Sequence, residues 1–125
     1  TPLFVECTVD ETTGEELTPL AHSSSRRVFS EQTAEKLQEL LAGVVAEGTG
    51  RQAAPSEGTA AGKTGTAQTG QFRDGEELKN YWFAGFYPAE KPRWTIVVMQ
   101  DAQTEPEVSS AAVFARLCDA LSAGE

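Results

Sequence analysis

The chain has 125 residues, 39% of them hydrophobic, and its net charge at pH 7 is −9. This length allows one domain at most, with enough apolar residues for a core. The acidic balance argues against nucleic acid and anionic lipid as partners, because both would require a basic face. No apolar run approaches the roughly 20 residues of a membrane span. Cys7 and Cys118 fit no metal-ligand spacing, so we expect two unpaired, buried thiols.

Residues 1–29 predict a surface hairpin followed by a polar connector. Two short runs, residues 3–9 and 15–20, flank a turn signal that reads Asp-Glu-Thr-Thr-Gly. The only histidine, His22, falls in the connector, where we expect a surface position rather than a catalytic role.

A helix is predicted over residues 30–48. Ser30 is a favourable N-cap, glutamate follows it in the first turn, and Gly48 ends the helix. Apolar residues recur at helical spacing between these limits and predict one buried face. They are Ala34, Leu37, Leu40, Leu41, Val44 and Val45. Residues 50–58 should form a polar loop.

Three antiparallel strands are predicted within residues 59–100, because the links between them are short. The first strand covers residues 59–69, and a polar segment, residues 70–79, follows it. The second, residues 81–87, has large side chains on both faces and should be covered on both sides. The third, residues 94–100, is strongly β-prone. Their aromatic residues should lie in the core, unless one of them lines a cleft: Trp82, Phe83, Phe86 and Trp94.

Residues 106–122 predict a closing helix. Pro106 stands at the favoured end of a helix, with glutamates on both sides. The expected buried stripe consists of Val108, Ala112, Ala115, Leu117 and Leu121. The predicted fold class is therefore α+β, an antiparallel sheet with helices packed on it.

Residues 61–68 read Ala-Gly-Lys-Thr-Gly-Thr-Ala-Gln and are the most informative stretch of the chain. On an extended strand, Lys63 and Gly65 share one face, while Thr64 and Thr66 share the other. A glycine within a strand often marks a place where a ligand or another backbone comes close. A lysine, two hydroxyl groups and the N–H groups of an exposed edge suit an extended peptide that ends in a carboxylate and docks as an added strand.

A phosphate-binding loop is the competing interpretation of this stretch. Residues 58–64 read Gly-Thr-Ala-Ala-Gly-Lys-Thr, one residue short of the pattern Gly-x4-Gly-Lys-[Ser/Thr]. The residues before it are polar where a buried strand should stand, and Gly65 and Thr66 disfavour the helix that should follow. Nucleotide binding is the weaker hypothesis.

Lys-Thr-Gly is a signature of penicillin-binding proteins and serine β-lactamases. The longer run at residues 61–68 resembles high-molecular-mass penicillin-binding transpeptidases. Residues 44–50 resemble the helix end and Gly-Thr-Gly turn before the signature, and residues 81–88 resemble the aromatic strand after it. Residues 111–114 resemble the start of the closing helix, without the proline often found there. The resemblance covers nearly the whole chain.

Two other motifs of that family are absent from this sequence. No serine has a lysine three residues later, so the Ser-x-x-Lys nucleophile is missing. The only asparagine, Asn80, is not part of a Ser-x-Asn motif. Both motifs precede Lys-Thr-Gly in the family. The resemblance therefore implies the C-terminal part of a class B D,D-transpeptidase domain, which is inactive without its N-terminal part.

The resemblance also implies roles for individual residues. Lys63 would support the positive potential of the cleft and assist proton transfer. The hydroxyl groups of Thr64 and Thr66 would bind the carboxylate of the substrate or drug, close to Gly65. The backbone N–H of Thr66 would belong to the oxyanion hole. The implied ligands are peptidoglycan stem peptides ending in D-Ala-D-Ala and β-lactams, and no metal or organic cofactor is required.

The implied location is the extracytoplasmic face of the bacterial membrane, with an N-terminal anchor. Two alternatives remain open, a non-catalytic β-lactam or peptidoglycan sensor and a serine β-lactamase fragment. The sequence does not separate division, elongation and sporulation roles. In the resembled fold the strand at residues 94–100 pairs with an N-terminal strand of the domain, so the isolated chain should self-associate through this edge.

Overall fold

The structure, a computed structural model, describes residues 7–17 and 26–124. The chain divides into two compact units, Thr1–Ser30 and Glu31–Glu125. None of the helices in the described ranges is long and apolar enough to cross a membrane.

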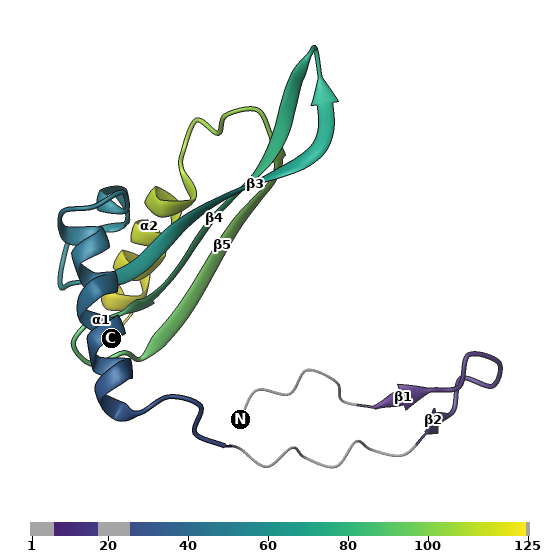
Figure 1. The fold of residues 1–125 in the computed structure, drawn as a ribbon, viewed down its shortest axis with the longest axis horizontal. Coiled ribbons are helices and arrows are strands. Elements are labelled where there is room, and N and C mark those ends of the chain that lie inside the picture. The colour runs from purple at the N-terminus through teal and green to yellow at the C-terminus, as the bar shows by residue number, and fades with distance from the viewer. Residues whose placement is uncertain (1–6, 18–25, 125) are drawn as a thin grey trace. The chain divides into compact units, whose positions relative to one another are not determined.

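The first unit contains a short antiparallel hairpin of β1 (Thr8–Val9) and β2 (Glu16–Leu17) (Figure 1). Its turn is fixed by Asp10, whose carboxylate accepts hydrogen bonds of 2.8 Å from the backbone N–H groups of Thr12 and Thr13. These bonds lower the pKa of Asp10. Residues 3–6 and 18–20 of the two predicted runs lie outside the described residues, as does His22.

The second unit contains a three-stranded antiparallel sheet in the order β3-β4-β5, together with two α-helices and one turn of 3-10 helix (Figure 1). The elements are α1 (Glu31–Ala46), η1 (Arg51–Ala53), β3 (Ala61–Arg73), β4 (Glu76–Tyr87), β5 (Trp94–Gln103) and α2 (Ser110–Ala123). The α+β class predicted from the sequence is confirmed. Residues 62–64 lie within β3, so no helix follows the lysine as a phosphate-binding loop would require.

The core lies between the sheet and α2. Phe83 of β4 and Phe114 of α2 are fully buried, and their ring centroids are 4.6 Å apart. Cys118 of α2, Val45 of α1 and Ala53 of η1 belong to the same buried cluster. Residues 50–58, predicted to be a polar loop, include η1, and the small apolar side chain of Ala53 is fully buried in the core.

The sheet is longer than the sequence predicted. Residues 70–79 were expected to be a polar segment, but they continue β3 and β4 as a hairpin that extends beyond the helices (Figure 1). Asp74 and Gly75 form its turn, with φ angles of 53° and 86°. Asp-Gly favours tight hairpin turns because both residues tolerate positive φ. Polar side chains are compatible with strands here because residues 70–76 are exposed.

Only one face of the sheet is covered within the second unit, so the prediction that β4 is covered on both sides was wrong. Phe83 and Tyr87 are buried on the covered face. On the opposite face Trp82 is 38% exposed, and its neighbours on β5, Val97 and Met99, are 57% and 45% exposed. Phe86 and Trp94 are half-buried.

The two helices also bury fewer apolar residues than predicted. In α1 only Val45 is buried, whereas Leu37 and Leu40 are 44% and 59% exposed. α2 begins at Ser110 rather than at Pro106, because the hydroxyl of Ser109 caps it by accepting from the N–H of Ala112 at 3.1 Å. The buried residues of α2 are Ser110, Ala111, Phe114, Ala115 and Cys118. Of the predicted stripe only Ala115 is among them, and Leu117 is 42% exposed.

Candidate active site

The Lys-Thr-Gly residues lie on β3, which is an outer strand of the sheet within the described residues. The register pairs Thr64 with Phe83 and Thr66 with Tyr81, so both threonines lie on the face that α2 covers. Lys63 lies on the opposite face, paired with Ala84. The alternation predicted from the sequence is therefore present in the strand.

Lys63 nevertheless reaches the threonine next to it. Its Nζ donates hydrogen bonds of 2.9 Å to the backbone oxygen and to Oγ1 of Thr64. Oγ1 of Thr64 also lies 3.4 Å from Oγ1 of Thr49, in the turn after α1. The ammonium group and two hydroxyl groups thus form one connected polar cluster at the surface. A cation beside hydroxyl donors is the arrangement that binds a carboxylate.

A cavity of about 200 Å³ opens beside this cluster. It is lined by Thr49, Gln52, Thr64, Gly65, Thr66, Tyr81, Trp82, Pro106, Ser109, Ser110 and Ala111. These side chains include no carboxylate, although the chain as a whole carries a net charge of −9. The cavity therefore offers hydroxyl and amide groups next to a lysine, without the negative charge that would repel an anion.

The wall of the cavity formed by α2 is held by hydrogen bonds between elements. Oγ of Ser109 donates to Oε1 of Gln52 in η1. Oγ of Ser110, which is buried, donates to the backbone oxygen of Tyr81 at 2.8 Å. The phenol of Tyr81 donates to the backbone oxygen of Thr104 at 2.6 Å. These bonds hold the start of α2 and the loop before it next to β4.

Of the four residues singled out from the sequence, Thr64, Gly65 and Thr66 line the cavity, and Lys63 contacts Thr64 from outside it. Of the four aromatic residues that were predicted to lie in the core or line a cleft, Trp82 lines it. Gln52 and Ser109 were not among the site residues predicted from the sequence. The capping preference of serine before an apolar helix could have indicated Ser109, whereas no local signal marks Gln52.

Comparison with known proteins then assigns the chain to a family. Residues 1–119 match the family model of the penicillin-binding protein transpeptidase domain. The chain belongs to this family. It is 36% identical over 104 residues to the stage V sporulation protein D of Bacillus subtilis, covering 81% of this chain and 16% of that protein. It is 41% identical over 90 residues to the penicillin-binding protein PbpB of Mycolicibacterium smegmatis, covering 61% of this chain and 13% of that protein.

Solved structures of transpeptidase domains have the same fold. The transpeptidase domain of Burkholderia pseudomallei penicillin-binding protein 3 superposes with a TM-score of 0.69 at 30% identity, covering 88% of this chain and 36% of that one. The D,D-transpeptidase domain of a peptidoglycan glycosyltransferase from Eggerthella lenta gives a TM-score of 0.64 at 29% identity, covering 95% and 27%. The chain thus spans about a third or less of each solved relative.

Proposed function

We propose that this chain is the C-terminal part of the catalytic domain of a serine-type D,D-transpeptidase that cross-links peptidoglycan. One observation carries the proposal. The ammonium of Lys63 and the hydroxyl of Thr64 meet on an outer strand beside a cavity that has no carboxylate lining. Membership of the penicillin-binding protein transpeptidase family supports the same reaction.

The substrate would be a stem peptide that ends in D-Ala-D-Ala, docked along the outer edge of β3. Its terminal carboxylate would bind the hydroxyl groups of Thr64 and Thr66, close to Gly65. The positive charge of Lys63 would attract this carboxylate and assist proton transfer. The backbone N–H of Thr66 would donate to the oxygen of the carbonyl under attack, a contact whose loss costs roughly 3 kcal/mol of transition-state stabilisation.

The nucleophile would come from a segment N-terminal to this chain, because no Ser-x-x-Lys motif occurs within it. The serine would attack the carbonyl of the penultimate D-Ala and release the terminal D-Ala. The resulting acyl-enzyme would pass its acyl group to an amine on a neighbouring stem peptide. A β-lactam would acylate the same serine and leave it blocked. We place the reaction on the outer side of the cytoplasmic membrane, where the substrate is found, with an N-terminal anchor.

A fluorescent penicillin tests the proposal in two samples. The first sample is a longer protein that contains this chain and the residues encoded upstream of it. In this protein we expect covalent label on the serine of a Ser-x-x-Lys motif, detected by mass spectrometry. The 125-residue chain alone should take no label, because removal of a catalytic serine costs several orders of magnitude in rate. Label on a serine of the 125-residue chain alone would contradict the proposal that the nucleophile lies N-terminal to this chain. Reversible penicillin binding without label in the longer protein would favour a sensor over an enzyme.

A further inference from the structure

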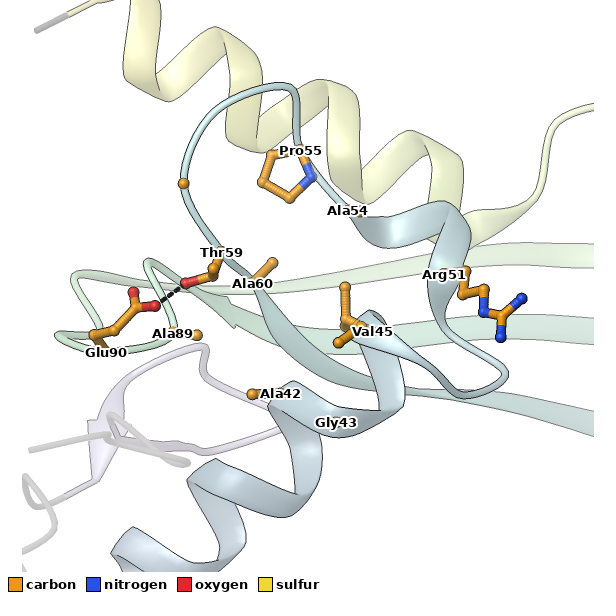
Figure 2. Close-up of a pocket in the computed structure, with 12 residues that line it drawn as sticks. Ala42, Gly43, Val45, Arg51, Ala54, Pro55, Thr59, Ala60, Ala89 and Glu90 are labelled. Atoms are coloured by element: carbon orange, nitrogen blue, oxygen red, sulfur yellow. Dashed lines mark hydrogen bonds between the residues drawn. The ribbon is translucent and has the colours of Figure 1, made fainter.

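A second cavity lies between α1, the loop before β3 and the turn after β4 (Figure 2). It shares no lining residue with the cavity beside Thr64. Its volume is about 450 Å³, within the range of roughly 300–1,000 Å³ typical of small-ligand sites. Most of its wall consists of alanine and glycine, so the elements meet here without side chains long enough to fill the space between them.

One end of this cavity is acidic. An adjoining hollow is lined by Glu35, Gln38, Glu39, Ala42, Ala89 and Glu90, of which Ala42, Ala89 and Glu90 also line the cavity. Three carboxylates therefore line this hollow, and one of them, that of Glu90, also lines the cavity. Lys36 forms an ion pair of 2.7 Å with Glu39, but Lys36 lines neither the cavity nor the adjoining hollow. With Lys36 offsetting Glu39, the carboxylates of Glu35 and Glu90 leave a net negative charge on the lining of the hollow.

The carboxylate of Glu90 is held in place. It accepts a hydrogen bond from the hydroxyl of Thr59, drawn in Figure 2, and this bond lowers its pKa and keeps it ionised. Nε2 of Gln38 donates to the backbone oxygens of Ala89 and Glu90 and fixes the turn against α1.

Among the described residues that line the cavity, Arg51 is the only one with a positive charge, and its guanidinium already has a partner. The guanidinium of Arg51 donates to the backbone oxygen of Glu47 at 3.1 Å. In Figure 2 it lies at the opposite end of the cavity from Glu90. An anionic ligand would therefore meet the carboxylates at the opening before it reached a positive charge.

We propose that this cavity binds a small amphiphilic cation, an organic ammonium ion with an apolar body. The apolar body would fill the space between α1 and the loop before β3, which removes apolar surface from water. The ammonium group would stay at the opening, where Glu90 and its acidic neighbours attract it. This site is separate from the Lys-Thr-Gly strand, so the proposal does not depend on the proposed function.

Three probes of equal body size test the preference for a cation. 4-Phenylbutylamine, 4-phenylbutanol and 5-phenylpentanoate, each a phenyl ring on four methylene groups, are titrated against the chain and followed by ligand-observed NMR at micromolar protein concentration. The amine should bind with a dissociation constant on the order of 1 mM, as suits a ligand of about a dozen heavy atoms. The carboxylate should bind about tenfold more weakly, with the alcohol between them. Equal binding of all three probes would overturn the proposal.

Gly43 offers a way to close the cavity without disturbing the fold. It lines the cavity, and a Cβ built on it meets no atom within 4 Å. Gly43→Leu should fill the space and reduce amine binding at least tenfold. Gly43→Ala is the matched control and should leave binding within about twofold, and both variants favour the helix relative to glycine. Ala42→Leu blocks the same space from the neighbouring residue. Undiminished binding in both leucine variants would show that the amine does not occupy this cavity.

The charge is tested by Glu90→Gln, which keeps an oxygen to accept from Thr59. It should weaken amine binding about threefold, the effect of one exposed ion pair, and leave alcohol binding unchanged. Glu31→Gln removes the same charge from α1 outside both hollows and should have no effect. An equal loss in both variants would mean that the amine responds only to the net charge of the chain, which would also overturn the proposal.

Discussion

Gly62 and Phe83 pack so closely that a side chain on the glycine has no room, since a Cβ on Gly62 would lie 2.6 Å from Cε1 of the phenylalanine ring. The residue paired with Gly62 is also a glycine, Gly85, and a Cβ there would lie 2.4 Å from the backbone oxygen of Ala61. Two opposed glycines thus let β3 lie against β4 and the aromatic core directly before Lys63. The position of the lysine depends on this close packing.

Gly62→Ala should therefore destabilise the protein. We expect a loss of about 1–3 kcal/mol in the free energy of unfolding, the usual cost of overpacking a core. Gly65→Ala is the control three residues away, because its Cβ would lie 3.5 Å from Cβ of Trp82, an ordinary contact. Urea unfolding of both variants gives the measurement. Equal stability losses would mean that the contact with Phe83 relaxes without cost.

Lys63→Ala tests the proposed role of the lysine in the longer protein. Acylation by penicillin should slow at least tenfold, which corresponds to about 1.4 kcal/mol of activation free energy. Stability should change by no more than about 0.5 kcal/mol, because the side chain is exposed. Lys91→Ala, in the turn before β5, removes the same charge away from the cavity and should acylate normally. Wild-type acylation in Lys63→Ala would refute the assignment.

Cys118 should make stability depend on pH in the alkaline range. Its side chain is fully buried, and burial, with the charge of Asp119 beside it, raises its pKa to about 11. A thiol in the unfolded chain ionises near pH 8.5. Below that pH both states keep the proton, and the thiol gives no dependence of stability on pH. Between about pH 8.5 and 11 the unfolded state loses its proton first, so stability falls as the pH rises.

The free energy of unfolding, measured from pH 7 to 10.5, checks this dependence. Its decrease with rising pH should be smaller in Cys118→Ala. Alkylation provides a second measurement. Cys7 is half-buried and should react with iodoacetamide faster than Cys118, which the fold protects. Rapid labelling of Cys118 in the native chain at pH 8 would contradict its burial and its raised pKa.

The sequence predicted those elements whose side-chain pattern is local. The helical spacing of apolar residues and Gly48 located α1, and the alternation around Phe83 located β4. The hairpin beyond Gln68 was missed because its polar residues outweighed the Asp74-Gly75 turn signal. Prediction of the buried residues was less successful, since Leu37 and Leu117 suit a buried face but nothing within the second unit covers them.

The candidate site was partly predictable for the same reason. Lys63, Thr64 and Thr66 lie in one short motif, and strand alternation alone separates their faces. The contact between Gln52 and Ser109 joins residues that are 57 positions apart, and only the fold brings them together. The cavity that Gly43 lines could not be predicted from the sequence. Small residues leave a cavity only where the fold brings them together from separate elements.

The isolated chain should self-associate through β5. Within the described residues β5 pairs only with β4 and is an outer strand. Residues 94–99 contain no charge and no proline, and an unprotected edge of this kind invites pairing with another chain. Val97 and Met99 also expose an apolar surface next to Trp82. We therefore expect dimers or larger species of the isolated chain at micromolar concentration, measured by sedimentation velocity.

A charge placed on this strand should reverse the association. Val97→Lys puts a lysine on the exposed face of β5, where like charges of two chains would repel each other. It should shift the sedimentation profile towards the monomer. Gln71→Lys adds the same charge on the exposed hairpin of β3 and should leave the association unchanged. The edge does not drive assembly if the unmodified chain sediments as a monomer while the backbone amides of residues 94–100 exchange rapidly with solvent. In an assembled sample the same amides should be protected, because pairing with a second chain would occupy the N–H groups that β5 leaves free.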